Sequence, residues 1–531
     1  MAGICHSNAG LVTAPHLAAS EAGAEVLRAG GNAVEAMIAA AATIAVVYPH
    51  MNGIGGDGFW LIAEPGKPPR FIDACGPAGE RATIRRYHSL HYHEMPTRGG
   101  HAAASVAGAI GGWDLAYSAS RDLGGRIPLK DLVSDAVARA KGGIVVSRSQ
   151  AALTRDKLGE LGEVPGFADT FLIDGAPPEE GAILRLEKLA DTLDHLSNAG
   201  LSDFYRGDVA AEIAADLERI SSPVTRADLA RYEARLRKPL SLAISGATLF
   251  NAPPPTQGLA SLLILGLLDR LKPARAESFE HIHGLVEAIK RAFLVRDRVV
   301  ADPDRVPEPP SGFLNAGWLE AEAAKIDMRR TLEWPYKAKP GDTVWLGAMD
   351  RTGLAVSYIQ SVYWEFGSGC VLPATGITWQ NRAASFSLDP AALNALAPGR
   401  KPFHTLNPAM ARLSDGRMFV YGTMGGEGQP QTQAQIFSRV ITHGQELDAA
   451  LDAPRFLLGR TWGDPHTSLR LENRFDPDVI AALDRAGHEL VVLDEGYSDT
   501  MGHAGAILGR PTGDLIGDHD PRADGGAVAG G

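Results

Sequence analysis

Few residues of this sequence indicate a reaction by their type and spacing alone. No CxxC or HExxH motif is present, and the three cysteines lie far apart, at Cys5, Cys75 and Cys370. A lone cysteine more often fills a core than acts as a nucleophile. Acidic residues and a histidine cluster near the C-terminus at Asp518–Asp520, but we assign them no ligand role. We therefore predict neither a metal site nor a cofactor.

Two other features offer groups that bind negative charge. Gly425 and Gly426, in the string MGGEGQPQ, carry backbone N–H groups that no Cβ shields. Such groups can stabilise an oxyanion, although a tight strand-to-helix turn explains the same glycines. Arg382, in WQNRAASFS, can hold a carboxylate through two parallel hydrogen bonds of its planar guanidinium. A surface or interchain ion pair is the alternative for Arg382.

Thr343 opens the strand-like string TVWLGAMD. Since β-branched residues often begin strands for structural reasons, this position alone does not mark Thr343 as catalytic. A threonine hydroxyl reacts only when a base removes its proton, and a free α-amine, with a pKa of about 7.7–8.0, titrates in the right range. A threonine at a new N-terminus would therefore carry the nucleophile and its base in one residue.

The elements that must position these residues change in character at Thr343. Before it, apolar residues recur at helical spacing over Leu17–Arg28, and Asn32 can cap a second helix from Ala33 to about Val47. Residues 131–289 also favour helices. The first part of the chain is thus predicted to be rich in helices.

Strands are predicted for the second part of the chain. The strings TVWLGAMD, GLAVSYIQSVY and GRMFVYGT alternate apolar with polar or small residues and are separated by turns. The region Asp302–Asp342 is rich in proline and charge, so we expect a poorly ordered surface linker there. An ordinary two-domain chain would show the same boundary.

Composition and charge narrow the class of protein. The 531 residues include 45% hydrophobic and 21% charged residues, as in globular proteins. A net charge of −12 argues against nucleic acid or an anionic membrane as partner. The odd cysteine count favours reduced thiols, no signal-peptide pattern is seen, and the most apolar stretch, Ala36–Val47, is too short to span a bilayer. We therefore expect a cytoplasmic protein.

A set of short strings spread along the chain resembles the signatures of the γ-glutamyltranspeptidase family. Each string is weak alone, but they follow one order from about residue 10 to 525: GGNAVEA, NGIGGDGF, DFYRG, VTRADLARY, APPPTQG, DT at 342–343, FGSG, NP, MGGEGQPQ, APRF, GHAGAI and DPR. The resemblance implies an α/β (α+β) fold, the four-layer αββα sandwich of the N-terminal-nucleophile hydrolases. It also implies a precursor that cleaves itself once.

Carried onto this sequence, the resemblance places the cleavage between Asp342 and Thr343. The products would be a heavy chain, residues 1–342, and a light chain, residues 343–531, which stay packed as one unit. Cleavage would begin with attack of the Thr343 hydroxyl on the Asp342 carbonyl, and hydrolysis of the resulting ester would free the amine that serves as base.

The resemblance also implies roles for further residues. Ser361 stands where the family has a hydroxyl that hydrogen-bonds the nucleophile, and Gly425 and Gly426 stand at the oxyanion hole. Thr405 falls at a substrate-contacting hydroxyl, and its neighbour His404 replaces a second one. An isolated histidine is often structural, so both readings of His404 stay open.

The sequence departs from the transpeptidases where they grip an amino-acid substrate. Asp73 and Ala74 replace the Arg and Glu of the carboxylate clamp, and an anion there would repel a carboxylate. Tyr363 and Ser385 replace the Asn and Asp that hold the α-amine. These changes argue against glutathione as substrate, while Arg382, where an uncharged residue is common, is a candidate to bind the carboxylate of a different acidic amide.

Two more departures concern the residues after Thr343 and the lid loop, and the shorter lid favours hydrolysis over transfer. Val344 and Trp345 replace Thr-His and add apolar bulk beside the nucleophile, and Leu388–Gly399 is shorter than the usual lid loop, so water enters more readily. The strings GDTVWLGAMD, WQNR, FHTLNP and MGGEGQPQTQ are most similar to the oxamate amidohydrolase branch, which converts oxamate to oxalate and ammonia in purine nitrogen recovery.

We therefore expect an amidohydrolase acting on oxamate or a similar small carboxylate-bearing amide, with water as acceptor. The alternatives are a γ-glutamyl hydrolase or transpeptidase, a glutaryl-type acylase, and an uncleaved relative that only binds. The expected protein partner is the other chain of the same precursor, and a dimer of such heterodimers is left open.

Overall fold

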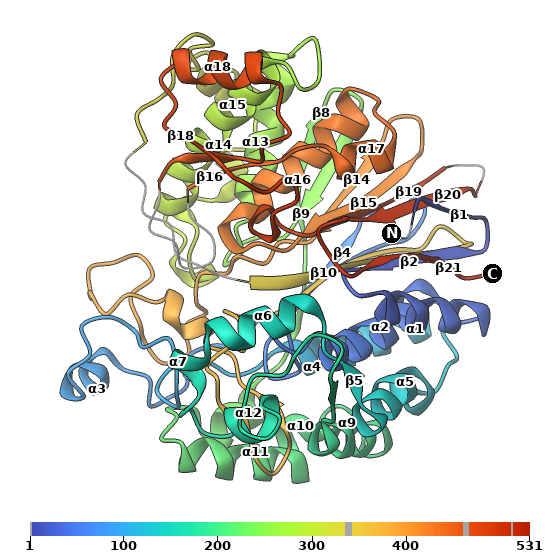
Figure 1. Ribbon diagram of the computed structural model, residues 1–531, viewed down its shortest axis with the longest axis vertical. Coiled ribbons are helices and arrows are strands. Elements are labelled where there is room, and N and C mark those ends of the chain that lie inside the picture. The colour runs from blue at the N-terminus through green and yellow to red at the C-terminus, as the bar shows by residue number, and fades with distance from the viewer. Residues whose placement is uncertain (1–2, 335–341, 460–466, 511–512) are drawn as a thin grey trace.

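The computed structural model describes residues 3–334, 342–459, 467–510 and 513–531. Two seven-stranded sheets pack face to face, and helices cover the outer face of each sheet (Figure 1). The contacts of strand β10 with β15 and β19 join the two sheets across the interior. The predicted α+β class and four-layer αββα sandwich are confirmed.

The sheet that carries Thr343 is antiparallel, with the order β21-β2-β10-β11-β3-β4-β7. Its strands are β2 (Gly10–Ala14), β3 (Asp57–Ala63), β4 (Arg70–Ala74), β7 (Arg235–Arg237), β10 (Asp342–Asp350), β11 (Ala355–Tyr363) and β21 (Gly526–Ala529). The helices packed on it include α1 (Leu17–Arg28), α2 (Ala33–Val47) and α4 (Ala109–Asp122). Strands from both parts of the chain are therefore interleaved, since β10 and β11, from after residue 341, lie between β2 and β3.

The second sheet has the order β1-β20-β19-β15-β14-β9-β8 and is also antiparallel. Its strands are β1 (Cys5–Ser7), β8 (Leu240–Ile244), β9 (Ala247–Asn251), β14 (Ala409–Leu413), β15 (Met418–Thr423), β19 (Ala504–Gly509) and β20 (Leu515–His519). The helices on its outer side are α13 (Gly258–Leu271), α14 (Phe279–Val299), α16 (Gln429–Phe437) and α17 (Leu447–Asp452). It too draws on both parts of the chain.

Smaller elements surround this sandwich. The helices are α3 (Ile84–Ser89), α5 (Leu129–Gly142), α6 (Arg148–Asp156), α7 (Leu158–Leu161), α8 (Phe167–Phe171), α9 (Glu187–Ala199), α10 (Asp203–Arg206), α11 (Asp208–Arg219), α12 (Arg226–Arg231), α15 (Ala316–Ala323) and α18 (Pro477–Arg485). The short strands are β5 (Ile144–Val145), β6 (Ile183–Leu184), β12 (Val371–Leu372), β13 (Ile377–Thr378), β16 (Phe456–Leu458), β17 (Leu469–Leu471) and β18 (Leu490–Val492). Single helical turns of other pitch include η3 (Arg382–Ser385) and η4 (Gly426–Gly428).

The second helix shows why local sequence fixes its start. The Asn32 side-chain oxygen accepts hydrogen bonds from the N–H groups of Val34 (3.1 Å) and Glu35 (3.0 Å). The Glu35 carboxylate in turn accepts from the Asn32 N–H at 3.0 Å, which completes a capping box. The predicted helices Leu17–Arg28 and Ala33–Val47 are confirmed, and every residue of the second is buried.

The expectation that residues 131–289 are mainly helical is confirmed, although β7, β8 and β9 occupy 235–251, with β7 and β8 at the edges of the two sheets. One other expectation about the first part of the chain is wrong. The described region after Asp302 is not a poorly ordered linker. It contains α15, whose start is capped by the Asn315 side chain accepting from the Trp318 N–H at 2.9 Å, and Leu319 is buried. Residues 335–341 lie outside the described residues.

Neighbouring side chains after Thr343 pack on opposite faces of the sheet. Val344 belongs to the core between sheet and helices, whereas Trp345 is fully buried between the two sheets with Phe59 and Met410. The Trp345 indole N–H donates to the Ser357 hydroxyl at 2.9 Å. The bulk that we expected beside the nucleophile is therefore core packing.

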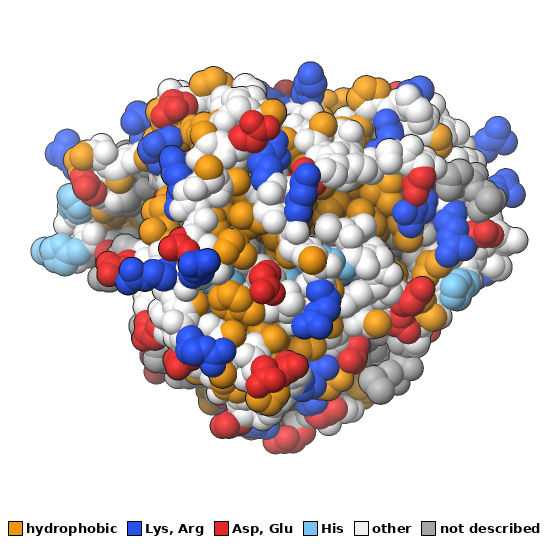
Figure 2. All heavy atoms as spheres, turned by 90° about the horizontal axis from the view of Figure 1, so that it is seen from above, with side chains coloured by type: hydrophobic (Ala, Val, Ile, Leu, Met, Phe, Trp, Pro, Cys, Tyr) orange, Lys and Arg blue, Asp and Glu red, His pale blue; other side chains and the backbone are white. Residues whose placement is uncertain are grey.

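The surface and the helices bear on two further expectations. On the face in Figure 2, basic and acidic side chains are interspersed, without a continuous basic area. Within the described residues, no helix has the length and apolar character that a bilayer crossing demands.

Candidate active site

Thr343 is the second residue of β10 and is 1% exposed. The pairing of β10 with β11 shifts at this point: Asp342 lies opposite Tyr363, but Val344 lies opposite Gln360. Thr343 therefore faces two residues of β11, an irregularity of the kind found beside active sites. Tyr363 has a φ of +86°, in the left-handed region that side chains other than glycine rarely adopt. The peptide bond expected to break, between Asp342 and Thr343, therefore lies where the regular pairing of the two strands is interrupted.

Ser361 lies in this irregular part of β11. Its hydroxyl accepts a hydrogen bond from the Tyr363 N–H at 2.7 Å, which holds the bulge, and the side chain is fully buried. A Cβ on Gly56 would lie 2.0 Å from the Ser361 carbonyl oxygen, so the Gly-rich turn before β3 can pack here only because Gly56 has no side chain. The shift in register leaves Ser361 and Val362 opposite Thr343, and the hydrogen bond from Ser361 to Thr343 stays a prediction.

Gly425 and Gly426 form the turn from β15 into η4 and α16. Their φ angles of +112° and +53° are left-handed, which explains the glycines at both positions. The strand-to-helix turn that we gave as the alternative is therefore present. The residue that follows this turn reaches Thr343, because the Gln429 side-chain N–H₂ donates to the Thr343 hydroxyl at 3.4 Å. The segment at Gly425 and Gly426 can therefore be a structural turn and still serve as the proposed oxyanion site.

Gln429 was not among the residues that the sequence predicted for the site. Its amide oxygen accepts from the Asn407 side chain at 3.1 Å, so the amide nitrogen is turned toward Thr343. Gln429 lies within the string MGGEGQPQ, which served only as a family signature. Nothing in its type or spacing distinguishes it from the other glutamines of α16.

Arg382 is fully buried, so a surface ion pair is the wrong interpretation of this residue. Its Nη1 donates to the Thr405 hydroxyl at 3.1 Å, and its guanidinium carbon lies 3.8 Å from the centre of the Tyr363 ring. Among the described residues, Nε and Nη2 have no hydrogen-bond partner. Burial lowers the pKa of Arg382 to about 10, which leaves it protonated at neutral pH. A buried cation with unused donors is a candidate site for an anion.

Asp57 is the carboxyl that acts on Arg382, and sequence reasoning missed it. Its Oδ1 accepts from the N–H groups of Gly76 and Gly108, each at 3.0 Å, and from the Gln380 side chain at 3.2 Å. Burial nevertheless raises the pKa of Asp57 to about 7, against the lowering effects of these donors and of Arg382. An acidic residue in a Gly-rich turn before an apolar strand was the available signal.

His404 and Ser385 have partners within the protein. His404 Nε2 lies 3.1 Å from Asp57 Oδ2, and Nδ1 accepts from the Leu406 N–H at 3.3 Å. Burial holds the pKa of His404 well below its usual range, so the ring is neutral. The Ser385 hydroxyl lies 3.0 Å from the Arg382 carbonyl oxygen and 2.9 Å from that of Phe403. These partners favour a supporting role beside Arg382 for both residues, and their contacts with substrate stay a prediction.

Asp73 does not act as a free anion in the site. It is 1% exposed and paired with Arg237 Nε at 2.9 Å and with Lys401 Nζ at 2.8 Å. Because two cations compensate its charge, the repulsion that we expected from this position is removed.

Two groups of buried side chains bring possible metal ligands together in the described part of the chain. In the group of Asp57, Cys75 and His404, the carboxylate oxygens are already hydrogen-bonded and Arg382 adds a positive charge nearby. The other group has its donors paired as well: His283 with His488 at 2.8 Å, and Glu287 with Lys290 at 3.0 Å. We assign a metal to neither group.

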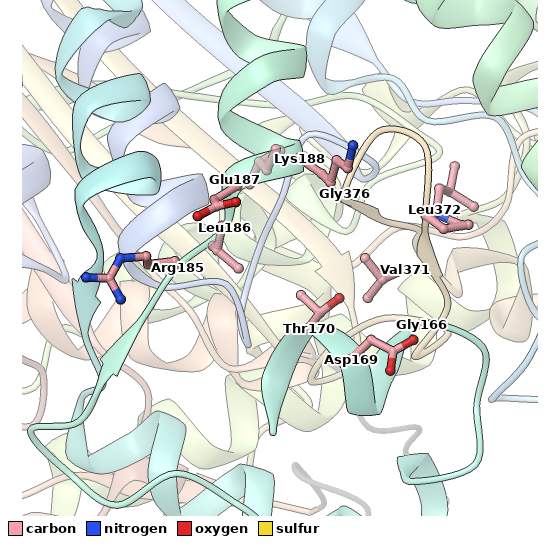
Figure 3. Close-up of a pocket in the computed structure, with 12 residues that line it drawn as sticks. Gly166, Asp169, Thr170, Arg185, Leu186, Glu187, Lys188, Val371, Leu372 and Gly376 are labelled. Atoms are coloured by element: carbon pink, nitrogen blue, oxygen red, sulfur yellow. The ribbon is translucent and has the colours of Figure 1, made fainter. Parts of the chain in front are cut away.

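A surface cavity of about 390 Å³ lies elsewhere (Figure 3). Its wall is formed by α8, the start of α9 and β12, with Asp169, Thr170 and Lys188 among the lining side chains. None of the predicted site residues lines it, so it is separate from the site around Thr343.

Known proteins resemble the chain in sequence and in structure. The sequence profile of the family Gamma-glutamyltranspeptidase matches residues 19–530. Over 523 residues, covering 98% of both chains, the protein is 51% identical to the oxamate amidohydrolase proenzyme of Klebsiella pneumoniae subsp. pneumoniae. It is 38% identical over 523 residues, with the same coverage, to the glutathione hydrolase-like YwrD proenzyme of Bacillus subtilis.

Among solved structures, the cephalosporin acylase from Bacillus halodurans matches with a TM-score of 0.91 at 31% identity, covering 100% of this chain and 97% of the acylase. Sequence and structure therefore agree over almost the whole length. The chain belongs to the γ-glutamyltranspeptidase family of N-terminal-nucleophile hydrolases and is an enzyme of that family.

Proposed function

We propose that this protein is a self-cleaving amidohydrolase that hydrolyses the amide of a small carboxylate-bearing substrate, with oxamate as first choice. The observation that carries the proposal is Arg382, a fully buried guanidinium with two nitrogens that lack partners among the described residues. Tyr363, which stacks on Arg382, is paired in the sheet with Asp342. The anion site and the reacting threonine therefore belong to one region.

The first reaction would be processing of the chain itself. Thr343 Oγ1 attacks the carbonyl carbon of Asp342, the C–N bond breaks, and an ester with a free amine results. Water then hydrolyses the ester and releases the Asp342 carboxyl group. The products are residues 1–342 and 343–531, and the new α-amine of Thr343 becomes the base.

The second reaction would follow the same chemistry on a substrate. The α-amine takes the Oγ1 proton as Oγ1 adds to the amide carbon, and the N–H groups of Gly425 and Gly426 stabilise the oxyanion. The proton passes to the leaving nitrogen, ammonia departs, and an acyl ester of Thr343 remains. Water, deprotonated by the same amine, hydrolyses that ester, and for oxamate the acid released is oxalate.

Oxamate is favoured over γ-glutamyl substrates by the residues around Arg382. Tyr363 and Ser385 stand where the transpeptidases hold the α-amine, but the Tyr363 ring stacks on the Arg382 guanidinium and the Ser385 hydroxyl lies within hydrogen-bond distance of two backbone carbonyls. Neither side chain offers the negative charge that would hold an α-ammonium group. The 51% identical relative is named an oxamate amidohydrolase. A glutaryl-type acylase is the second candidate, because Arg382 would also suit a distal carboxylate and an acylase shares the fold at a TM-score of 0.91. A cytoplasmic role in purine nitrogen recovery stays an expectation from the sequence.

Two assays test the proposal. Ammonia release from oxamate is measured beside nitroaniline release from a γ-glutamyl anilide and acid release from a glutaryl amide. We expect turnover of oxamate, and activity on the anilide alone would contradict the assignment. On a denaturing gel the wild type should show two chains, while Thr343→Ala should show one of 56.2 kDa and no activity. An active, uncleaved wild type would exclude Thr343 as an N-terminal nucleophile.

A further inference from the structure

Gln257 connects the two sides of the proposed site. It lies directly before α13 and is fully buried. Its amide nitrogen donates to the carbonyl oxygen of Gly426 at 2.8 Å and to that of Thr405 at 2.7 Å. Gly426 belongs to the proposed oxyanion turn, and the Thr405 hydroxyl contacts Arg382. One side-chain amide thus spans the distance between the oxyanion turn and the anion site.

Arg296 of α14 determines which way this amide points. Its Nη1 donates to the Gln257 amide oxygen at 3.0 Å, so the nitrogen must face the two carbonyls. Its Nη2 binds Glu427, the residue after Gly426, at 2.7 Å, and its guanidinium lies 3.9 Å from the centre of the Phe293 ring. Arg296 is fully buried. The oxyanion turn is therefore held both through Gln257 and directly.

We propose that Gln257 is a positioning residue that fixes the separation between the oxyanion turn and Arg382, with Arg296 orienting its amide. The inference rests on the proposed function and adds a physical reason why the enzyme would prefer a substrate of one length. In oxamate the carboxylate is bonded directly to the amide carbon, so both sites must be engaged at one fixed spacing. A substrate with a flexible spacer can adjust to a changed spacing, whereas oxamate cannot.

The test compares substrates of increasing length. Oxamate, malonamate, succinamate and glutaramate are assayed by ammonia release with the wild type, Gln257→Met and Arg296→Lys. We expect Gln257→Met to lower kcat/KM for oxamate by about 10²-fold and that for the longer amides much less, because small misplacements are costly for a rigid substrate. Arg296→Lys, which keeps a cation beside Glu427, should shift the profile in the same direction by a smaller factor.

Gln431 offers a matched control. It is 1% exposed and bonds the backbone of Leu458 through both amide atoms, at 3.0 and 2.8 Å. Gln431→Met should lower stability while keeping the preference for chain length. Chain cleavage and the melting temperature are followed for each variant, so that a fall in folded enzyme is separated from a change in preference.

The outcomes distinguish the two proposals. If the wild type hydrolyses oxamate but Gln257→Met and Arg296→Lys slow every amide equally, the positioning role is wrong and the function stands. If the wild type prefers a longer amide, oxamate is the wrong substrate, and the positioning role still requires the shortest active amide to suffer most. A wild type that is inactive on the whole series overturns both.

Discussion

Arg382 and Asp57 carry the charges that decide what the proposed site binds. Burial lowers the pKa of Arg382 only to about 10, while burial raises that of Asp57 to about 7. With both groups ionised the empty site is close to neutral, and a bound carboxylate makes it negative. The two residues therefore act on an anionic substrate in opposite directions.

Removing the Arg382 cation should weaken substrate binding. Arg382→Met would leave the buried carboxylate of the bound substrate without its cation. KM for oxamate should therefore rise by about 10²-fold or more in steady-state assays. Arg382→Lys keeps the charge but loses the parallel hydrogen bonds, so its KM should lie between those of the wild type and Arg382→Met. Arg439→Met is the control, because Arg439 is equally buried but its cation is paired with Glu277, at 2.8 Å, and not with a proposed site residue. Its KM should stay unchanged. An unchanged KM in Arg382→Met would place the carboxylate elsewhere.

The ionisation of Asp57 gives substrate binding a pH dependence. Below about pH 7 its carboxyl is neutral and Arg382 attracts the anion unopposed, whereas above it the negative charge of Asp57 opposes binding. KM for oxamate should therefore increase as the pH rises through about 7. Over a similar range kcat should also increase, as the Thr343 amine loses its proton with a pKa of about 7.7–8.0. Asp57→Asn should give a flat KM profile, and a KM rise that persists in this variant would have another origin.

Among the elements, those defined by local sequence were predictable. Asn32 and the apolar run after it fix α2, and the alternation after Thr343 fixes β10. The strands at 235–251 were missed because they are short and lie between helices, with charged residues such as Arg235 on them. The burial of Arg382 was also beyond prediction, since its surroundings come from β3, β11 and the segment at Thr405, far apart in sequence.

The bulge in β11 gives a prediction at this scale. Ser361→Ala removes the acceptor for the Tyr363 N–H and a hydroxyl opposite Thr343, so self-cleavage should slow by about tenfold or more. The appearance of the two chains is followed on denaturing gels after synthesis of the precursor. Ser357→Ala, on the same strand, removes only the acceptor for the Trp345 indole and should cleave at the normal rate. Equal self-cleavage rates in both variants would show that the bulge does not contribute to processing.

In the whole molecule, the proposed cleavage products share both sheets and both large cores. Strands β10 and β11 pair with β2 and β3, so hydrogen-bonded ladders cross from residues 1–342 to residues 343–531. One core joins Val34 and Ile38 to Val344, and another joins Leu262 to Phe419. The proposed cleavage would therefore break one peptide bond without separating any layer.

This arrangement predicts how the cleaved enzyme unfolds. The two chains should elute together in size-exclusion chromatography and separate only in denaturant, because each alone would expose strand edges and core. Uncleaved Thr343→Ala should melt at a temperature independent of protein concentration, as a single chain does. The cleaved wild type should melt at a temperature that falls on dilution, since its unfolding releases two chains. Separation of the chains without denaturant would show that the ladders across β2–β10 and β3–β11 do not hold the halves together.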